Sequence, residues 1–231
     1  GTRLEQNGLY DLLAFDPNDF RSIDLAIVGE PTDNTVQLGC VGSLHAKVTV
    51  FGQACHSARP WNGKNALYEA LPFIENMKKI EPQKHTIFGV DFFDVIQITE
   101  SNTEPGRTTL PGYWECDVNF RFAPTRDSEN ATKHIIDLFH KFGLKEENYE
   151  ILDVAESGQV IENHVFKDIV AKLKAPIEAK QAWTDVSQLT SMGIAAFNYG
   201  PGLTAQAHKE NEYTKIDYLT EYVEKLLHAL K

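Results

Sequence analysis

The pattern of hydrophobic and polar residues changes its period several times along the 231-residue chain. Residues 45–51 place β-branched Val48, Thr49 and Val50 in alternation with the polar His45 and Lys47, as in a half-buried strand. Residues 64–79 instead carry apolar side chains at three- and four-residue spacing, which predicts an amphipathic helix. The same reasoning predicts further strands over 92–99, 113–122 and 149–154, a second helix over 128–142, and a polar loop over 100–112. From residue 39 to 155 the order is strand, helix, strand, strand, helix, strand, the βαββαβ pattern of a ferredoxin-like unit.

The two ends of the chain predict a different arrangement. Residues 1–38 contain one short apolar run, a predicted strand over 23–29. Residues 156–231 alternate predicted helices and strands, with helices over 163–173, 185–192 and 216–230 and strands over 177–181 and 195–198. We therefore predict an α/β fold in which residues 1–38 and 156–231 form one discontinuous, partial domain and residues 39–155 are inserted into it.

Composition limits the classes of partner. The net charge is −11, whereas binding to nucleic acid or to an anionic membrane needs a basic face. No apolar run approaches the roughly 18 residues of a membrane-spanning helix. The three cysteines, Cys40, Cys55 and Cys116, are odd in number and widely spaced, which favours reduced thiols and a cytoplasmic protein over a disulfide framework.

Two residues in loops are candidate metal ligands. Glu30 follows the apolar run at 25–28, and His208 follows the run at 194–197 after a Gly-Pro-Gly turn. Ligand groups collect at the carboxyl ends of strands in open α/β sheets, and carboxylate oxygen and imidazole nitrogen both suit zinc. On spacing alone, a solvated carboxylate and an ordinary loop histidine explain the same residues, and these alternatives are the commoner ones.

One segment carries a specific resemblance. Residues 52–66, GQACHSARPWNGKNA, resemble the lid-domain stretch G-x-x-x-H-S-A-R-x-W-x-G-x-N-A of succinyl-diaminopimelate desuccinylases. These enzymes are members of the dinuclear-zinc aminoacylase/carboxypeptidase family, peptidase family M20. Six further motifs follow the order of that family over nearly the whole chain: Asn7-Gly8-Leu9, Gly29-Glu30-Pro31-Thr32, Gly39-Cys40-Val41-Gly42, Asn119-Phe120-Arg121-Phe122-Ala123-Pro124, Thr184-Asp185-Val186 and the run from Gly200 to His208.

The resemblance implies a fold and a function. The fold is the C-terminal part of a zinc-peptidase-like α/β catalytic domain with an inserted ferredoxin-like lid, through which the family forms homodimers. The function is metal-dependent hydrolysis of N-succinyl-diaminopimelate, an N-acyl amino acid, with release of succinate in lysine and diaminopimelate biosynthesis. The implied cofactor is a pair of zinc ions, for which cobalt can substitute. Alternatives are an acetylornithine deacetylase or metallocarboxypeptidase of the same family, and a non-catalytic dimerisation or binding module.

The resemblance also assigns roles to residues. Glu30 matches the carboxylate ligand of one metal ion, and His208 matches the last ligand, on the second ion. His56 matches a lid histidine that reaches the active site of the other subunit and donates to the oxyanion, a contribution worth roughly a hundredfold to a thousandfold in rate. Arg121 matches an anion-binding arginine, because a guanidinium can hold a carboxylate through two hydrogen bonds. A surface arginine paired to Glu115 or Asp117 is the structural alternative for Arg121.

The resemblance also implies substrate-binding residues at positions whose motifs are less specific. Arg59, Thr108, Gly200 and Gly202 match or replace substrate-binding positions of the family. Thr108 begins Thr-Thr-Leu-Pro where the family has Asn-x-Ile-Pro, so that a hydroxyl stands in place of an amide donor. Gln188 stands where desuccinylases commonly carry arginine. Both departures bear on substrate range. Thr184 and Asp185 are expected to open a helix as N-cap and first-turn acid.

Several family motifs are absent from this sequence. Upstream of the Asn-Gly-Leu position the family carries a His-x-Asp motif, a metal-bridging Asp and a Glu-Glu pair, and this chain begins at Gly1 without them. The resemblance therefore implies a C-terminal portion. We expect the 231-residue chain alone to bind zinc weakly and to be inactive, because only two of the five protein ligands and no general base are present.

Overall fold

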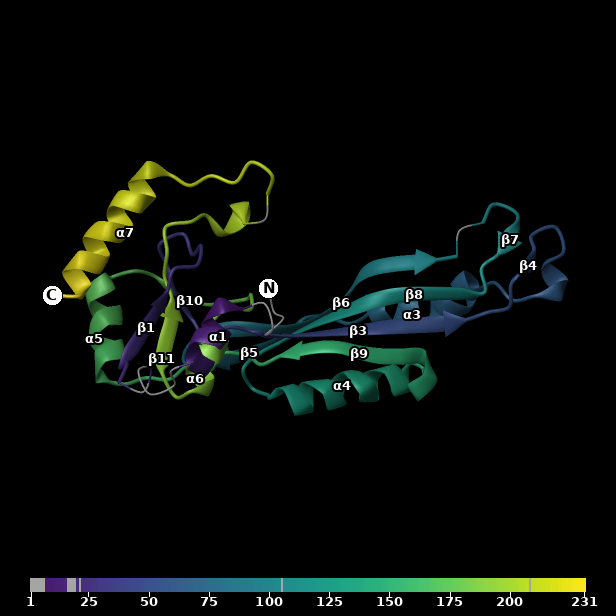
Figure 1. Ribbon diagram of the computed structural model, residues 1–231, viewed down its shortest axis with the longest axis horizontal. Coiled ribbons are helices and arrows are strands. Elements are labelled where there is room, and N and C mark those ends of the chain that lie inside the picture. Colours follow the sequence, from purple (N-terminus) through teal and green to yellow (C-terminus); the bar gives the residue numbers. More distant parts are fainter. Residues whose placement is uncertain (1–6, 16–19, 21, 105, 208) are drawn as a thin grey trace.

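The computed structural model describes residues 7–15, 20, 22–104, 106–207 and 209–231. Figure 1 shows an elongated molecule, with a small sheet and most of the helices at one end and a long sheet extending from it to the other end. No helix among the described residues is long and apolar enough to cross a membrane. The mixed α/β fold predicted from the sequence is confirmed.

The small sheet joins both ends of the chain. Its strands are β1 (Leu25–Val28), β2 (Val36–Leu38), β10 (Ile177–Ala179) and β11 (Ala195–Asn198), in the order β1-β11-β2-β10. β1 runs parallel to β11 and β10 runs parallel to β2, whereas β11 and β2 are antiparallel. Residues far apart in sequence thus form one sheet, as the predicted discontinuous domain requires. The domain limits at 38/39 and 155/156 stay a prediction.

Helices α1 (Gly8–Phe15), α5 (His164–Leu173), α6 (Val186–Ser191) and α7 (Ile216–Ala229) accompany this sheet. Asn163 is the N-cap of α5, and its side-chain oxygen accepts a hydrogen bond from the Phe166 N–H at 2.8 Å. This is a standard N-cap interaction. Phe166 then packs edge-on against Phe197 of β11, with ring centroids 5.6 Å apart. The contact anchors α5 to the sheet through two buried aromatic side chains.

The long sheet has five antiparallel strands in the order β5-β6-β8-β3-β9. They are β3 (Gly42–Phe51), β5 (Gln83–Ile87), β6 (Val90–Thr103), β8 (Tyr113–Phe122) and β9 (Tyr149–Ala155), and α3 (Ala66–Lys78) and α4 (Ser128–Lys141) lie along the sheet. If β5 is left aside, the strands of this sheet follow one another along the chain as β3, β6, β8 and β9, the first to the fourth. Their spatial order is fourth, first, third, second, which confirms the predicted ferredoxin-like unit.

The two faces of the long sheet differ because side chains alternate along each strand. Leu44, Ala46 and Val48 of β3 are fully buried and belong to the core that includes Phe73 of α3 and Phe139 of α4. The side chains between them, such as His45, point to the opposite face. One face therefore holds the hydrophobic core, and the other carries polar groups.

Two parts of the long sheet differ from the sequence prediction. β5 was not predicted, and it pairs with β6 as a hairpin. The stretch 100–112 was expected to be a loop, but β6 continues to Thr103 and β7 (Thr109–Leu110) pairs with β4 (Cys55–His56). These residues are polar because they lie at an exposed edge and tip, where pairing needs no apolar pattern. A shift of register between Ile98 and Glu100 also interrupts the alternation.

Replacing Phe139 by alanine should lower the free energy of unfolding by about 3–5 kcal/mol, because the ring is fully buried and packs against Phe73 at 6.1 Å. Phe51→Ala is the matched control, since that ring is 57% exposed at the end of β3. It should change the free energy by less than about 1 kcal/mol. Urea denaturation of both variants tests this, and equal effects would contradict the described core.

Candidate functional site

The first group of candidate residues lies at one edge of the small sheet. β1 and β11 are parallel, and Val28 is in register with Asn198. The loops that follow these strands therefore leave the sheet at the same edge. Glu30 lies in the loop after β1, and Gly200 and Gly202 lie in the loop after β11. The structure thus brings together the predicted residues Glu30, Gly200 and Gly202, which we call the rim.

Hydrogen bonds join the two rim loops. The Thr32 hydroxyl accepts from the Gly200 N–H at 3.0 Å and donates to the Gly200 carbonyl at 3.1 Å. The Asp33 N–H donates to the Gly202 carbonyl at 2.8 Å. A Cβ atom on Gly200 would lie 2.4 Å from the Glu30 carbonyl oxygen, and one on Gly202 would lie 2.8 Å from Pro31. Both glycines are therefore required for close approach of the backbones.

A buried lysine adjoins the rim and was not predicted from the sequence. Lys180 follows β10 and is only 5% exposed, and its ammonium group donates to the Pro31 carbonyl at 3.1 Å. Burial lowers the pKa of Lys180, and the negative charges of Glu30 and Asp33 oppose this shift. An isolated lysine in a polar stretch carries no pattern that would indicate burial. Its position fixes a positive charge close to Glu30.

The rim by itself is not a complete metal site. The described residues contain no group of three or more His, Cys, Asp or Glu side chains that could hold a metal ion. Of the two predicted metal ligands, Glu30 lies among the described residues, and its side chain is half-buried. His208, the other predicted ligand, lies outside the described residues. The pairing of Glu30 with His208 stays a prediction.

The second group lies at the tip formed by β4 and β7. His56 pairs with Thr109 across this short ladder, and the Ser57 N–H donates to the Thr108 carbonyl at 2.8 Å. The Arg59 N–H donates to the His56 carbonyl, also at 2.8 Å. The structure therefore brings together three predicted residues, His56, Arg59 and Thr108, all with exposed side chains.

A local hydrogen bond orients the His56 ring. Its Nδ1 atom accepts from the Ala58 N–H at 3.1 Å. Because Nδ1 acts as acceptor, the neutral ring carries its proton on Nε2. The exposed nitrogen of His56 is then a hydrogen-bond donor, as stabilisation of an oxyanion requires.

The third position is Arg121 on β8, at the end of the long sheet nearer the rim. It is in register with Ser43, the second residue of β3, whereas the tip follows the far end of β3. The guanidinium Nε donates to the Asn119 side-chain oxygen at 2.9 Å. Burial lowers the pKa of Arg121, and the carboxylate of Asp153 opposes the shift. The described residues show no ion pair between Arg121 and Glu115 or Asp117, and the roles proposed for Arg121 stay predictions.

The tip and the rim are far apart within one chain. Figure 1 places β4 and β7 at the end of the molecule opposite β1 and β11. The long strands β3, β6 and β8 span the distance between them. His56 of one chain therefore does not reach Glu30 of the same chain.

The helix opening at residue 184 differs from the prediction. Asp185 is the N-cap of α6, but its side chain makes no capping bond and instead accepts from Asn7 Nδ2 at 2.9 Å. The expected capping role is therefore wrong. The Thr184 hydroxyl and both amide atoms of Gln188 are buried and have no hydrogen-bond partner among the described residues. Buried polar atoms are hydrogen-bonded in most proteins, so these three atoms are exceptions within the described part of the chain.

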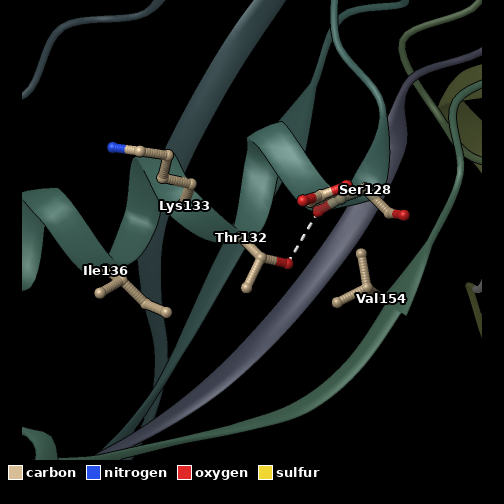
Figure 2. Close-up of a pocket in the computed structure, with 6 residues that line it drawn as sticks. Ser128, Thr132, Lys133, Ile136 and Val154 are labelled. Carbon is tan, nitrogen blue, oxygen red and sulfur yellow. Dashed lines mark hydrogen bonds between the residues drawn. The ribbon is translucent and has the colours of Figure 1, made fainter.

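An open groove lies elsewhere, between α4 and β9 (Figure 2). Its volume is about 390 Å³, and the Thr132 hydroxyl in its wall donates to the Ser128 carbonyl at 2.7 Å. It is lined by Ser128, Glu129, Thr132, Lys133, Ile136 and Val154. None of the predicted site residues is among them, so the groove is separate from the candidate site.

The chain is similar to several known proteins. Residues 38–147 match the family described as the peptidase dimerisation domain. The chain is 32% identical over 208 residues to a succinyl-diaminopimelate desuccinylase of Corynebacterium glutamicum. The aligned region covers 88% of this chain and 56% of the relative. It is 30% identical to a putative succinyl-diaminopimelate desuccinylase of Mycobacterium tuberculosis, over 90% of this chain and 58% of the relative. The chain thus spans a little over half the length of these curated relatives.

A solved structure shows the same fold. An M20 family metallo-carboxypeptidase from Sulfolobus solfataricus matches with a TM-score of 0.68, covering 96% of this chain and 66% of that chain. The sequence identity is 17%, so this likeness concerns the fold alone. It extends over both sheets, because the match leaves few residues of this chain uncovered.

Gly200→Ala should destabilise the chain by about 1–3 kcal/mol, because the added methyl group meets the Glu30 carbonyl oxygen at 2.4 Å. Gly29→Ala is the matched control in the neighbouring loop, since nothing lies within 4 Å of its added Cβ. It should change the free energy of unfolding by no more than about 0.5 kcal/mol. Urea denaturation compares the two, and a neutral Gly200→Ala variant would contradict the described rim.

Proposed function

Because the chain belongs to the M20 peptidase family, we propose that it is part of a metal-dependent amidohydrolase that releases succinate from N-succinyl-diaminopimelate. The observation that carries the proposal is the identity with desuccinylases, which covers 88% of this chain. The separation of the tip from the rim supports it, because such an enzyme then needs two subunits to complete each site.

The peptidase dimerisation domain indicates a homodimer, and we propose that β6 and α3 form its interface. β5 pairs with β6 only through Val90–Asp94, so residues 95–103 have an open edge within the described part of the sheet. An open edge presents backbone N–H and C=O groups that pair with a second strand. Antiparallel pairing of two β6 edges about a twofold axis would join two long sheets.

Helix α3 distinguishes this edge from the β9 edge. Its exposed side includes Leu67, Tyr68 and Leu71, which are 39%, 66% and 46% exposed. No large hydrophobic side chain of α4, the other helix along the sheet, is exposed. Exposed apolar side chains beside an open edge are typical of an interface. The β6 side of the sheet therefore suits a second copy better than the β9 side.

Tyr68→Glu should weaken this homodimer by about tenfold or more, because it places a charge on the apolar side of α3. Sedimentation equilibrium at several protein concentrations measures the dissociation constant. Lys133→Glu on α4 is a control on the opposite side, and it should leave the dissociation constant unchanged. A wild-type chain that is monomeric at tens of micromolar would contradict the proposed interface.

In the proposed dimer His56 acts on the rim of the partner subunit. Its Nε2–H donor would stabilise the oxyanion that forms when water attacks the acyl carbonyl. The bond from the Ala58 N–H to Nδ1 supports this role, because it holds the ring in the required tautomer before substrate binds. Arg59 and Thr108 adjoin His56 and would contact the substrate from the same tip.

Arg121 is proposed to bind a carboxylate of the substrate. A succinylated amino acid carries a free carboxylate on its acyl group, and a guanidinium binds a carboxylate through two parallel hydrogen bonds. Its Nε is already occupied by Asn119, so the terminal nitrogens are the groups that would contact the ligand. Gly200 and Gly202 would contribute through the shape of the rim, because the space beside each glycine is filled by Glu30 or Pro31.

The proposed cofactor is zinc, with Glu30 as one ligand and His208 as another. Bound zinc would supply Lewis acidity and lower the pKa of bound water. The nearby ammonium group of Lys180 holds the Pro31 carbonyl, and so would position the loop that carries Glu30. The described residues do not complete the site, and the remaining ligands and the general base are proposed to come from the part of the enzyme that this chain does not span.

Mixing two inactive variants tests this function. The test protein is a chimaera that joins this chain to the part of the Corynebacterium glutamicum desuccinylase that it does not match. The chimaera should release succinate from N-succinyl-diaminopimelate, and Glu30→Ala and His56→Ala should each lower the activity by roughly a hundredfold or more. After mixing and subunit exchange, about one quarter of the activity should return, because half of the dimers contain one complete site.

The controls separate the alternatives. Each variant exchanged with itself should stay inactive. No recovery in the mixture would show that His56 and Glu30 do not act across subunits. Preferential hydrolysis of N-acetylornithine would favour the deacetylase, and a chimaera that folds and dimerises without hydrolysing either substrate would favour a binding module.

A further inference from the structure

A row of hydrogen-bonded polar side chains leads to Arg121 on the face of the long sheet opposite the helices. Asp117 Oδ2 lies 3.2 Å from His45 Nδ1, and His45 Nε2 lies 3.0 Å from Asn119 Nδ2. Asn119 Oδ1 accepts from Arg121 Nε at 2.9 Å. His45 is only 26% exposed and Asn119 only 9%. The row therefore links a titratable ring to the guanidinium through one buried amide.

The orientation of the Asn119 amide is fixed by two groups with a single hydrogen-bonding role. Asn119 Nδ2 donates to the Leu44 carbonyl at 3.2 Å, and a carbonyl can only accept. Asn119 Oδ1 faces Arg121 Nε, which can only donate. A flipped amide would place oxygen against oxygen and N–H against N–H. Both contacts would then be lost.

This orientation also fixes the tautomer of His45. The Nε2 atom faces the donor Nδ2 of Asn119, so it must act as acceptor and carry no proton. The Nδ1 atom faces the Asp117 carboxylate and carries the proton. The hydrogen bonds of the row are consistent only with a neutral His45.

The charged groups around His45 come from three strands. Asp117 and Arg121 lie on β8, Asp153 on β9 is in register with His45, and Lys47 lies on β3 itself. Lys47 forms an ion pair with Glu150 at 3.3 Å. Of these groups, Asp117 alone makes a direct hydrogen bond to the ring. A change of Arg121 with pH could therefore be caused by protonation of His45 or by protonation of one of the acidic groups. Different variants are needed to distinguish these two causes.

We propose that His45 and Asn119 are positioning residues, which hold the Arg121 guanidinium for a carboxylate while His45 is neutral and release it when His45 is protonated. A proton on Nε2 would face the N–H of Asn119, and the Leu44 carbonyl prevents the amide from turning to accept it. The Asn119 amide must then shift away from the proton, and Arg121 Nε loses its acceptor. The identity of the bound group as a substrate carboxylate rests on the proposed function, whereas the coupling of Arg121 to His45 does not.

Three substitutions of His45 separate the states of the ring. His45→Gln retains an acceptor for Asn119 and a donor for Asp117, and it cannot be protonated in this range. His45→Lys presents only donors and so imitates the protonated ring. His45→Ala removes both groups. The measurement is the ¹⁵N–¹H signal of Arg121 Nε in the 231-residue chain, recorded at about pH 8 and about pH 5.5. The signal is assigned by its absence in Arg121→Lys.

The wild-type signal should be protected from solvent exchange at the higher pH, and should shift and lose protection at the lower pH. In His45→Gln it should stay protected at both values, and in His45→Lys and His45→Ala it should be unprotected at both. Backbone spectra report whether each variant remains folded. An unchanged wild-type signal would overturn the proposal. The same change in His45→Gln would also overturn it, since the origin would then be Asp117 or Asp153.

Titration with succinate separates this inference from the proposed function. Succinate should shift the Arg121 signal, with binding about tenfold weaker at the lower pH in wild type and unchanged in His45→Gln. Another outcome is that the Arg121 signal changes with the state of His45 and yet does not shift when succinate is added. That result would support the positioning of Arg121 by His45 and would contradict the proposed role of Arg121 in carboxylate binding.

Discussion

The strict alternation of side chains along β3 and β8 is the constraint on which the rest of the structure depends. Leu44, Ala46 and Val48 face the helices and are fully buried, so His45 and Lys47 must face the other way. A slip of one residue in the pairing of β3 with β8 would move Arg121 and Asn119 into the hydrophobic core. Burial of one face therefore sets the positions of the polar groups on the other.

The same strands determine how the site is divided. β3 has ten residues and connects the rim region to the tip without a break, so His56 is held away from Glu30 by a rigid sheet. Neither group can approach the other by a change in a loop. In a dimer formed through the same sheet, the rigid strands would hold the tip of one chain at a fixed position relative to the rim of the other. The inserted unit would then position a catalytic group as well as join the subunits.

Much of the fold could be predicted from the sequence, because in long amphipathic segments the spacing of apolar residues distinguishes a helix from a strand. The helix at 128–142 and the strand at 113–122 agree with α4 and β8 to within one residue. Strands β2, β4, β5 and β7 are not predicted from the sequence, and β2, β4 and β7 have only two or three residues, which carry no period. The Glu30 loop could be placed from strand order, whereas Lys180 could not, since its burial depends on loops distant in sequence. His56 was predicted from the resemblance, but its tautomer depends on the local turn at Ala58.

The overall charge of the protein explains why the orientation of Arg121 matters. A chain with net charge −11 repels a dicarboxylate at long range, so recognition depends on cations fixed at short range. Arg121 is partly buried, which lowers its pKa, but a guanidinium remains charged under these conditions. Its single hydrogen bond to Asn119 then decides where the two terminal nitrogens point. In an acidic protein, a neutral histidine beside that amide is a better support than a second cation, because it orients the arginine without competing for the carboxylate.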